Sequence, residues 1–204
     1  PLVVAKHPRG KLMTTSAVRL DPARTRASIA RLLRPKAIAL IGASPTPGSL
    51  GAGVLGNLTR FGYAGDIHLI NPNRTQIDGR PCLKSAWDLP EGVDCAIIAV
   101  PQAAVLDAVK ACAARNVGGV VIFGAGFAEQ GAQGKALQDE LAKIAADAGM
   151  AVEGPNCLGY VNYVDAVATT FGTMAPFPVN GRRAVGIVSQ SGAMATVMRA
   201  ALQA

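Results

Sequence analysis

The segment from residue 36 to residue 51, KAIALIGASPTPGSLG, constrains the fold of this chain more than any other. Ala37 to Ile41 is an unbroken apolar run, as expected for a parallel strand that is covered on both faces. A small-residue turn follows, and a helix that opens at Ser49 would point its unpaired N–H groups and positive dipole end back at that turn. The glycines of the turn are Gly42, Gly48 and Gly51. This arrangement binds phosphate, so the segment predicts a nucleotide-like ligand that is held by its diphosphate.

Up to residue 160, short apolar runs alternate with stretches of helical periodicity. We expect strands over 36–43, 66–71, 93–100, 119–123 and from 151, helices over 21–33, 49–62, 103–116 and 132–148, and a loop with a short turn over 75–90. This repeated β-α-β order predicts an α/β fold with a Rossmann-like, doubly wound parallel sheet over residues 36–160. Ligands bind such sheets at the carboxyl ends of the strands, so five loops should meet at one rim.

The pattern weakens after Tyr160. Residues 161–182 are rich in Thr, Pro, Gly and Asn, which predicts a linker. Ala184 to Val188 then has the pattern of a new strand, and the segment SQSGAMATVMRAAL after it predicts a small-residue turn and a helix. One strand and one helix cannot bury their own apolar faces. We therefore expect residues 183–204 to begin a second α/β domain, and the chain to be a fragment of a longer protein.

The net charge of +7 is concentrated near the N-terminus. Residues 1 to 36 carry nine Lys and Arg against Asp21 alone, whereas the remainder is close to neutral. We interpret residues 1–35 as a solvated basic leader with a short helix, although such an arm can also contact nucleic acid, a membrane or an acidic partner. Aromatic residues make up only 4% of the chain, so stacking on bases has little support and no nucleic-acid partner is expected. No membrane association is expected either, because no apolar run approaches the roughly 20 residues that cross a bilayer.

Four cysteines are widely spaced and form no CxxC pair, which argues against a zinc site or dithiol chemistry, and no metal site is predicted. They are Cys82, Cys95, Cys112 and Cys157. Cys95 and Cys112 fall in apolar patterns and should be core thiols. The set is compatible with a reducing cytoplasm, which is the expected location.

The residues after the second expected strand narrow the choice of ligand. The turn GASPTPGSLG is not the GxGxxG of dinucleotide oxidoreductases, and an NAD site would want Asp or Glu after that strand. This chain instead has Asn71, Pro72, Asn73 and Arg74. A cation there suits a ribose phosphate, as in NADP or the 3′-phosphorylated adenosine of coenzyme A. The other reading is that Arg74 is a surface loop residue.

Six segments occur in a fixed order: GASPTPGSLG, INPNR, AVPQAAV, FGAGFAE, GPNCLG and VSQSGA. Together, over about residues 36–204, they resemble the N-terminal half of the NDP-forming acyl-CoA synthetases, which include ADP-forming acetate–CoA ligases and are related to the succinyl-CoA synthetase α subunit. The resemblance implies a CoA-binding domain, then flavodoxin-like domains. It implies the reaction of a carboxylic acid, CoA and ATP to acyl-CoA, ADP and phosphate, through an acyl phosphate and a phosphorylated histidine. A separate ATP-grasp domain or subunit would handle ATP and Mg²⁺, in a homo- or hetero-oligomer.

The resemblance also implies roles for individual residues. The turn would wrap the CoA diphosphate, and the loop after the second strand would contact the 3′-phosphate. Residues 100–102 would lie against the adenine side, and residues 123–125 beside the pantetheine. Asn156 would lie near the thioester end. The implied CoA-binding residues are Gly42, Ser44, Pro45, Thr46, Gly48, Ser49, Asn71, Asn73, Arg74, Val100, Pro101, Gln102, Phe123, Gly124, Ala125 and Asn156. Ser189, Ser191 and Gly192, at a helix N-terminus, would cradle the phosphate of the phosphohistidine.

The phosphorylated histidine itself is expected beyond Ala204, so no catalytic residue is assigned. His7 and His68 are interpreted as solvated and structural, Cys157 as a wall residue, and Glu129 as either a site residue or a solvated one. Two alternatives stay open: a CoA-binding regulatory module of a fused protein acetyltransferase, and an NADP-binding oxidoreductase domain. A nucleic-acid adaptor that uses the basic leader is disfavoured by the near-neutral body.

Overall fold

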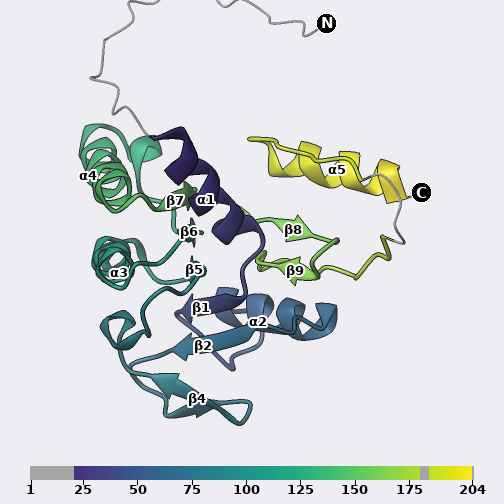
Figure 1. Ribbon diagram of the computed structural model, residues 1–204, viewed down its shortest axis with the longest axis horizontal. Coiled ribbons are helices and arrows are strands. Elements are labelled where there is room, and N and C mark those ends of the chain that lie inside the picture. Colours follow the sequence, from purple (N-terminus) through teal and green to yellow (C-terminus); the bar gives the residue numbers. More distant parts are fainter. Residues whose placement is uncertain (1–20, 180–183, 204) are drawn as a thin grey trace, which may run out of the picture.

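A seven-stranded, mostly parallel sheet forms the centre of the computed structural model, which describes residues 21–179 and 184–203 (Figure 1). The order across the sheet is β3-β4-β2-β1-β5-β6-β7. The strands are β1 (Ala37–Ile41), β2 (Asp66–Ile70), β3 (Gln76–Ile77), β4 (Arg80–Leu83), β5 (Cys95–Ile98), β6 (Gly119–Ile122) and β7 (Ala151–Glu153). Only the β3–β4 pair is antiparallel. The α/β, Rossmann-like fold predicted from the sequence is confirmed.

Helices cover both faces of the sheet (Figure 1). On one face lie α3 (Gln102–Ala114) and α4 (Ala132–Ala148), and on the other α1 (Pro22–Leu33) and α2 (Leu50–Phe61). Side chains alternate along each strand, so Ile38 and Leu40 pack toward α2 while Ala39 and Ile41 pack toward α3. Because both faces are covered, the central strands are apolar throughout, and this is why the sequence showed unbroken hydrophobic runs.

The direction of winding reverses between β1 and β5. From β1 the chain passes through α2 to β2 on one side, whereas β5 pairs with the other edge of β1 and leads on to β6 and β7. The chain therefore leaves β1 and β5 toward opposite faces of the sheet, to α2 and to α3. In open α/β sheets this switch point is the usual place for a ligand.

Three segments differ from the sequence-based expectation. Residues 75–90 hold the β3–β4 hairpin and the short 3₁₀ helix η1 (Ala86–Asp88), because β4 pairs with the free edge of β2. Residues 161–179, expected to be irregular, include an antiparallel pair, β8 (Val161–Asn162) with β9 (Val167–Ala168), and Val167 to Thr170 are buried on the α2 side.

The strand predicted at Ala184 to Val188 is wrong: these residues have no regular structure, and in the described part of the chain no strand pairs with them. A strand needs a partner for its backbone groups, and apolar composition alone does not supply one. The helix predicted after SQSG is present as α5 (Gly192–Gln203). It lies beside the β8–β9 hairpin in Figure 1. Of the predicted leader, residues 1–20 lie outside the described residues.

Candidate functional site

The glycine-rich turn after β1 is packed tightly against the rest of the sheet. Gly42 has φ +92°, and a Cβ placed on it would lie 2.4 Å from the carbonyl oxygen of Ala99 after β5. A Cβ on Gly51, in the first turn of α2, would lie 2.3 Å from the carbonyl oxygen of Gly42. Glycine at these two places therefore brings β1, the loop after β5 and the start of α2 into direct backbone contact.

The N-terminus of α2 opens onto this turn. Ser49 is the N-cap residue: its Oγ accepts from the Ala52 N–H at 3.2 Å and donates to the Thr46 carbonyl at 2.8 Å. Inside the turn, the Thr46 N–H donates to the Oγ of Ser44 at 3.1 Å. These bonds fix the turn around the end of the helix, where the first N–H groups lack intrahelical partners. Unpaired N–H groups at a helix N-terminus are able to receive an anion.

The loop after β2 is joined to the turn by Asn71. Its Nδ2 donates to the Ala43 carbonyl at 2.7 Å, and its Oδ1 accepts from the Asn73 N–H at 2.8 Å. The side chain of Lys84, at the end of β4, reaches the same loop and donates to the carbonyls of Pro72 and Arg74, both at 3.2 Å. Arg74 is exposed at the surface of this loop.

The loops after β5 and β6 form the opposite wall of the rim. The Ala99 N–H donates to the Ile41 carbonyl at 2.8 Å, and the Nε2 of Gln102 donates to the Gly126 carbonyl at 3.3 Å. Phe123 is buried, and its ring meets the ring of Phe171 edge-on at a centroid distance of 5.0 Å. Val100, Pro101, Gly124 and Ala125 belong to the same two loops. The bond between Gln102 and Gly126 thus joins the loop after β5 to the loop after β6.

Glu129 closes the loop after β6. Its Oε1 accepts from the Gly126 N–H at 2.6 Å, and backbone hydrogen bonds, that one foremost, lower the pKa of this carboxyl group. An ionised carboxylate that caps its own loop accounts for the residue locally. This position therefore supports the solvated alternative rather than a role in the site.

The segment GPNCLG follows β7. The Asn156 N–H donates to the Gly124 carbonyl at 2.9 Å, so this loop is joined to the one after β6. The Sγ of Cys157 donates to the Ile122 carbonyl at 3.3 Å, and burial raises the pKa of this thiol to about 11. A thiol with a raised pKa is a poor nucleophile, which fits a wall residue. Burial also raises the pKa of Glu153, the last residue of β7, to about 7.

The segment predicted to hold phosphate lies at the start of α5. The Oγ of Ser189 accepts from the Ser191 N–H at 3.1 Å, and the Oγ of Ser191 accepts from the Met194 N–H at 3.3 Å. A Cβ on Gly192 would lie 2.2 Å from the Cδ1 of Leu158, so this helix end touches the GPNCLG segment. The two serines cap the helix.

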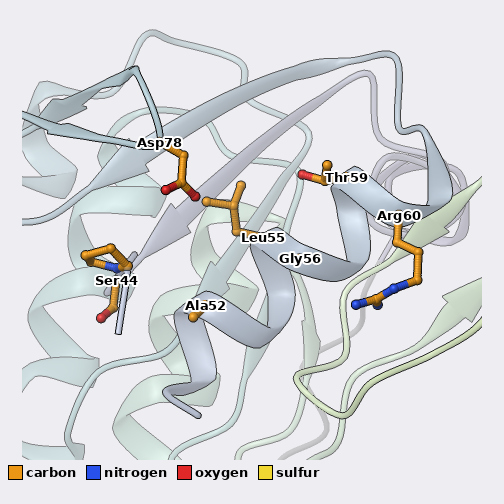
Figure 2. A pocket seen from close by; sticks show the side chains of 8 residues that line it. Ser44, Ala52, Leu55, Gly56, Thr59, Arg60 and Asp78 are labelled. Carbon is orange, nitrogen blue, oxygen red and sulfur yellow. The ribbon is translucent and has the colours of Figure 1, made fainter. Parts of the chain in front are cut away.

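The structure brings the loops after β1, β2, β5, β6 and β7 to one edge of the sheet, where hydrogen bonds and close contacts connect each loop to a neighbour. A hollow of about 310 Å³ adjoins this edge, between the turn after β1, α2 and Asp78 of the β3–β4 hairpin (Figure 2). It shares Ser44 and Pro45 with the predicted site, and its other lining residues are Ala52, Leu55, Gly56, Thr59, Arg60 and Asp78. The remaining predicted residues do not line this hollow.

Sequence reasoning missed one buried residue that supports the site. Asn57 of α2 is fully buried, and its Nδ2 donates to the carbonyls of Thr170 and Gly172, both at 2.7 Å. Its Oδ1 accepts from the Met174 N–H at 3.1 Å and from Arg60. It thereby holds the segment after β9 against α2. The available signal was an asparagine among Val54, Leu55 and Leu58 on an apolar helix face.

Comparison with known proteins agrees with this geometry. A family model described as a CoA binding domain matches residues 36–163. A trans-feruloyl-CoA synthase from an unknown prokaryotic organism is 51% identical over 175 residues, which is 85% of this chain and 25% of that protein. An ADP-forming acetate–CoA ligase from Archaeoglobus fulgidus is 42% identical over 80% of this chain and 23% of its own length. The chain therefore spans about a quarter of the length of these relatives.

Solved structures give the same result. The crystal structure of PH0766 from Pyrococcus horikoshii OT3 superposes with a TM-score of 0.76 at 37% identity, over 86% of this chain and 39% of that one. A dinucleotide forming acetyl-coenzyme A synthetase from Ca. Korarchaeum cryptofilum, in complex with phosphate and ADP, superposes with a TM-score of 0.73 at 34% identity, over 86% of this chain and 36% of that one. Across residues 21–179 and 184–203, none of the helices combines the length and apolar character that a membrane crossing requires. Because the CoA binding domain model covers more than half of its length, this chain belongs to the CoA binding domain family, and the relatives that share this domain include enzymes named CoA ligases.

Proposed function

We propose that the chain binds coenzyme A across the rim, as the CoA-binding portion of an enzyme that makes acyl-CoA from a carboxylic acid, CoA and ATP, with release of ADP and phosphate. The observation that carries this proposal is the open N-terminus of α2 beneath a glycine turn at the β1–β5 switch point. Relatives named as ligases of acetate, 4-hydroxybutyrate and ferulate support a carboxylic acid as the second substrate.

The CoA diphosphate would lie at the turn formed by Ser44 to Ser49. Ser49 and Thr46 already bond within the turn, which leaves the N–H groups of Leu50 and Gly51 to meet the anion. A helix N-terminus supplies partial positive charge at this place. Gly42 would belong to the site because its backbone shapes the turn. Gly48 would belong to it because a Cβ added there would meet no protein atom within 4 Å, which leaves room for a ligand.

The two ends of CoA would extend from the turn in opposite directions. Arg74, with Asn71 and Asn73 shaping its loop, would meet the 3′-phosphate, and residues Val100 to Gln102 would line the adenine side. Phe123 to Ala125 would lie along the pantetheine arm, which would bring the CoA thiol toward Asn156. In this arrangement the chain binds and orients CoA, and CoA itself supplies the thiol.

Phosphate chemistry would take place where the rim meets α5. Ser189, Ser191 and Gly192 would bind the phosphoryl group carried by a histidine outside residues 1–204, and the contact of Gly192 with Leu158 supports placing it near the thioester end. Residues 36–160 would form the CoA-binding domain and residues 183–204 the start of a second domain. An ATP-grasp domain or subunit would supply ATP and Mg²⁺, in a homo- or hetero-oligomer located in the cytoplasm.

Calorimetric titration of the chain with CoA and with NAD tests the ligand assignment. CoA should bind with a measurable heat and NAD should not, because the loop after β2 offers a cation and no carboxylate to a ribose. Tighter binding of NAD than of CoA would refute the proposal.

A further inference from the structure

Lys84 is an exposed lysine at the end of β4 whose side chain is held in one place. Its Nζ donates to the carbonyls of Pro72 and Arg74, both at 3.2 Å. The backbone sets up this contact, because β4 pairs in parallel with β2 and the Asn71 N–H donates to the Leu83 carbonyl at 3.0 Å. Residue 84 therefore emerges directly beside the loop that contains Arg74.

The charge of Lys84 is not neutralised by these contacts. Carbonyl oxygens satisfy two of the three ammonium donors but carry no net charge. The ion pairs found among residues 21–179 and 184–203 include neither Lys84 nor Arg74. Two cationic residues thus adjoin one short loop: Arg74 belongs to it, and the ammonium group of Lys84 bonds to its backbone. An anion bound at this loop would be attracted by both charges.

We propose that Lys84 is a second recognition residue for a phosphate monoester at this loop: it positions the loop that presents Arg74 and adds its own positive charge. The ligand class is a dianionic phosphate on a nucleoside, which in the proposed function is the 3′-phosphate of CoA. The inference rests on that proposed function. A guanidinium can bind such a phosphate in a bidentate manner, while an ammonium acts as a compact point charge, so the two groups complement each other.

A purely structural role makes a different prediction. If Lys84 only supports the fold of the rim as a whole, replacing it should lower the affinity for CoA and for dephospho-CoA equally, because both ligands use the same turn and the same wall. If it recognises the terminal phosphate, the loss should be confined to CoA and should shrink at high salt, since exposed charges are screened.

The test is calorimetric titration of the chain, as wild type, Lys84→Met, Lys84→Arg and Lys143→Met, with CoA and dephospho-CoA at low and high salt. Lys143 is an exposed lysine on α4 that pairs with Asp147, so its replacement removes the same net charge away from the rim. Lys84→Met should lower the affinity for CoA about fivefold at low salt, which is the upper range for an exposed ion pair, and the affinity for dephospho-CoA by less than about twofold. Lys84→Arg should retain the preference for CoA, and Lys143→Met should match the wild type.

Two results would overturn the inference: no change in CoA affinity for Lys84→Met, or equal losses for both ligands. A wild-type chain that fails to bind CoA at all would instead refute the proposed function, so the two failures are distinguishable. Far-UV circular dichroism of each variant shows whether it is folded. If Lys84→Met unfolds, the decision passes to Lys84→Arg, whose loss of preference for CoA over dephospho-CoA would contradict the inference.

Discussion

Replacing Gly42 by alanine should destabilise the fold at the switch point. Its φ of +92° suits glycine, and a side chain there costs about 1–2 kcal/mol. The new Cβ would lie 2.4 Å from the Ala99 carbonyl oxygen, about 1 Å short of ordinary contact. Relieving that overlap must move the end of β1 away from the loop after β5, which costs a further 1–3 kcal/mol, roughly as overpacking does. The expected loss is about 2–5 kcal/mol of the free energy of unfolding.

Gly56→Ala is the matched control. Gly56 lies inside α2, and a Cβ there meets nothing within 4 Å. The substitution should therefore stabilise the helix by up to about 1 kcal/mol, the difference in helix propensity. Urea unfolding followed by circular dichroism measures both variants. A Gly42→Ala protein within 0.5 kcal/mol of the wild type, roughly the scatter of neutral surface changes, would refute the packing of the turn described above.

Three further predictions concern ligand binding and pH. Arg74→Ala should weaken CoA more than dephospho-CoA in calorimetry, and equal losses would argue against its reading the 3′-phosphate. Gly48→Val should abolish CoA binding, because the new side chain would stand in the turn; its φ of +82° strains any side chain, but its Cβ would meet no protein atom within 4 Å, so the strain should stay local. Unchanged affinity would place the ligand elsewhere. Burial raises the pKa of Glu153 to about 7, so its folded-state pKa exceeds the unfolded value of about 4.5. The free energy of unfolding should therefore decrease as the pH rises from about 4.5 to 7, by at most about 3 kcal/mol. If the free energies of unfolding of the wild type and Glu153→Gln differed by the same amount at every pH, this prediction would be wrong.

The parts of the fold that could be predicted are those with a strong local pattern. The strand at Ala37–Ile41 and the helix Leu50–Phe61 were predicted to within two residues at each end, because continuous apolar runs and a serine N-cap each reflect a direct physical requirement. The hairpin β3–β4 was missed because its strands are short, contain Pro81 and depend on the edge of β2. The strand expected at Ala184–Val188 failed for the converse reason: it has the composition of a strand, but no strand among the described residues pairs with it.

Parts of the candidate site could likewise be predicted from the sequence, and other parts could not. The rim could be predicted because parallel strands bring their carboxyl ends to one edge, whatever the side chains are. The contacts of Lys84 with Pro72 and Arg74 could not be predicted, because they join residues that follow two different strands, β4 and β2, whose pairing no local pattern shows. The buried asparagine of α2 is a similar case, since its four partners include the backbone of a segment more than a hundred residues away.

The glycines of the turn also show how a binding motif and a packing motif can coincide. A Cβ on Gly42 or Gly51 would collide with the protein's own backbone, so these two glycines are required by the fold even if no ligand ever binds. Gly48 differs, because its Cβ would meet no protein atom within 4 Å and only its backbone conformation favours glycine. A side chain at Gly48 would therefore occupy space that the proposed diphosphate needs. Among the three positions, Gly48 is the one where lost affinity reports on the ligand rather than on the sheet.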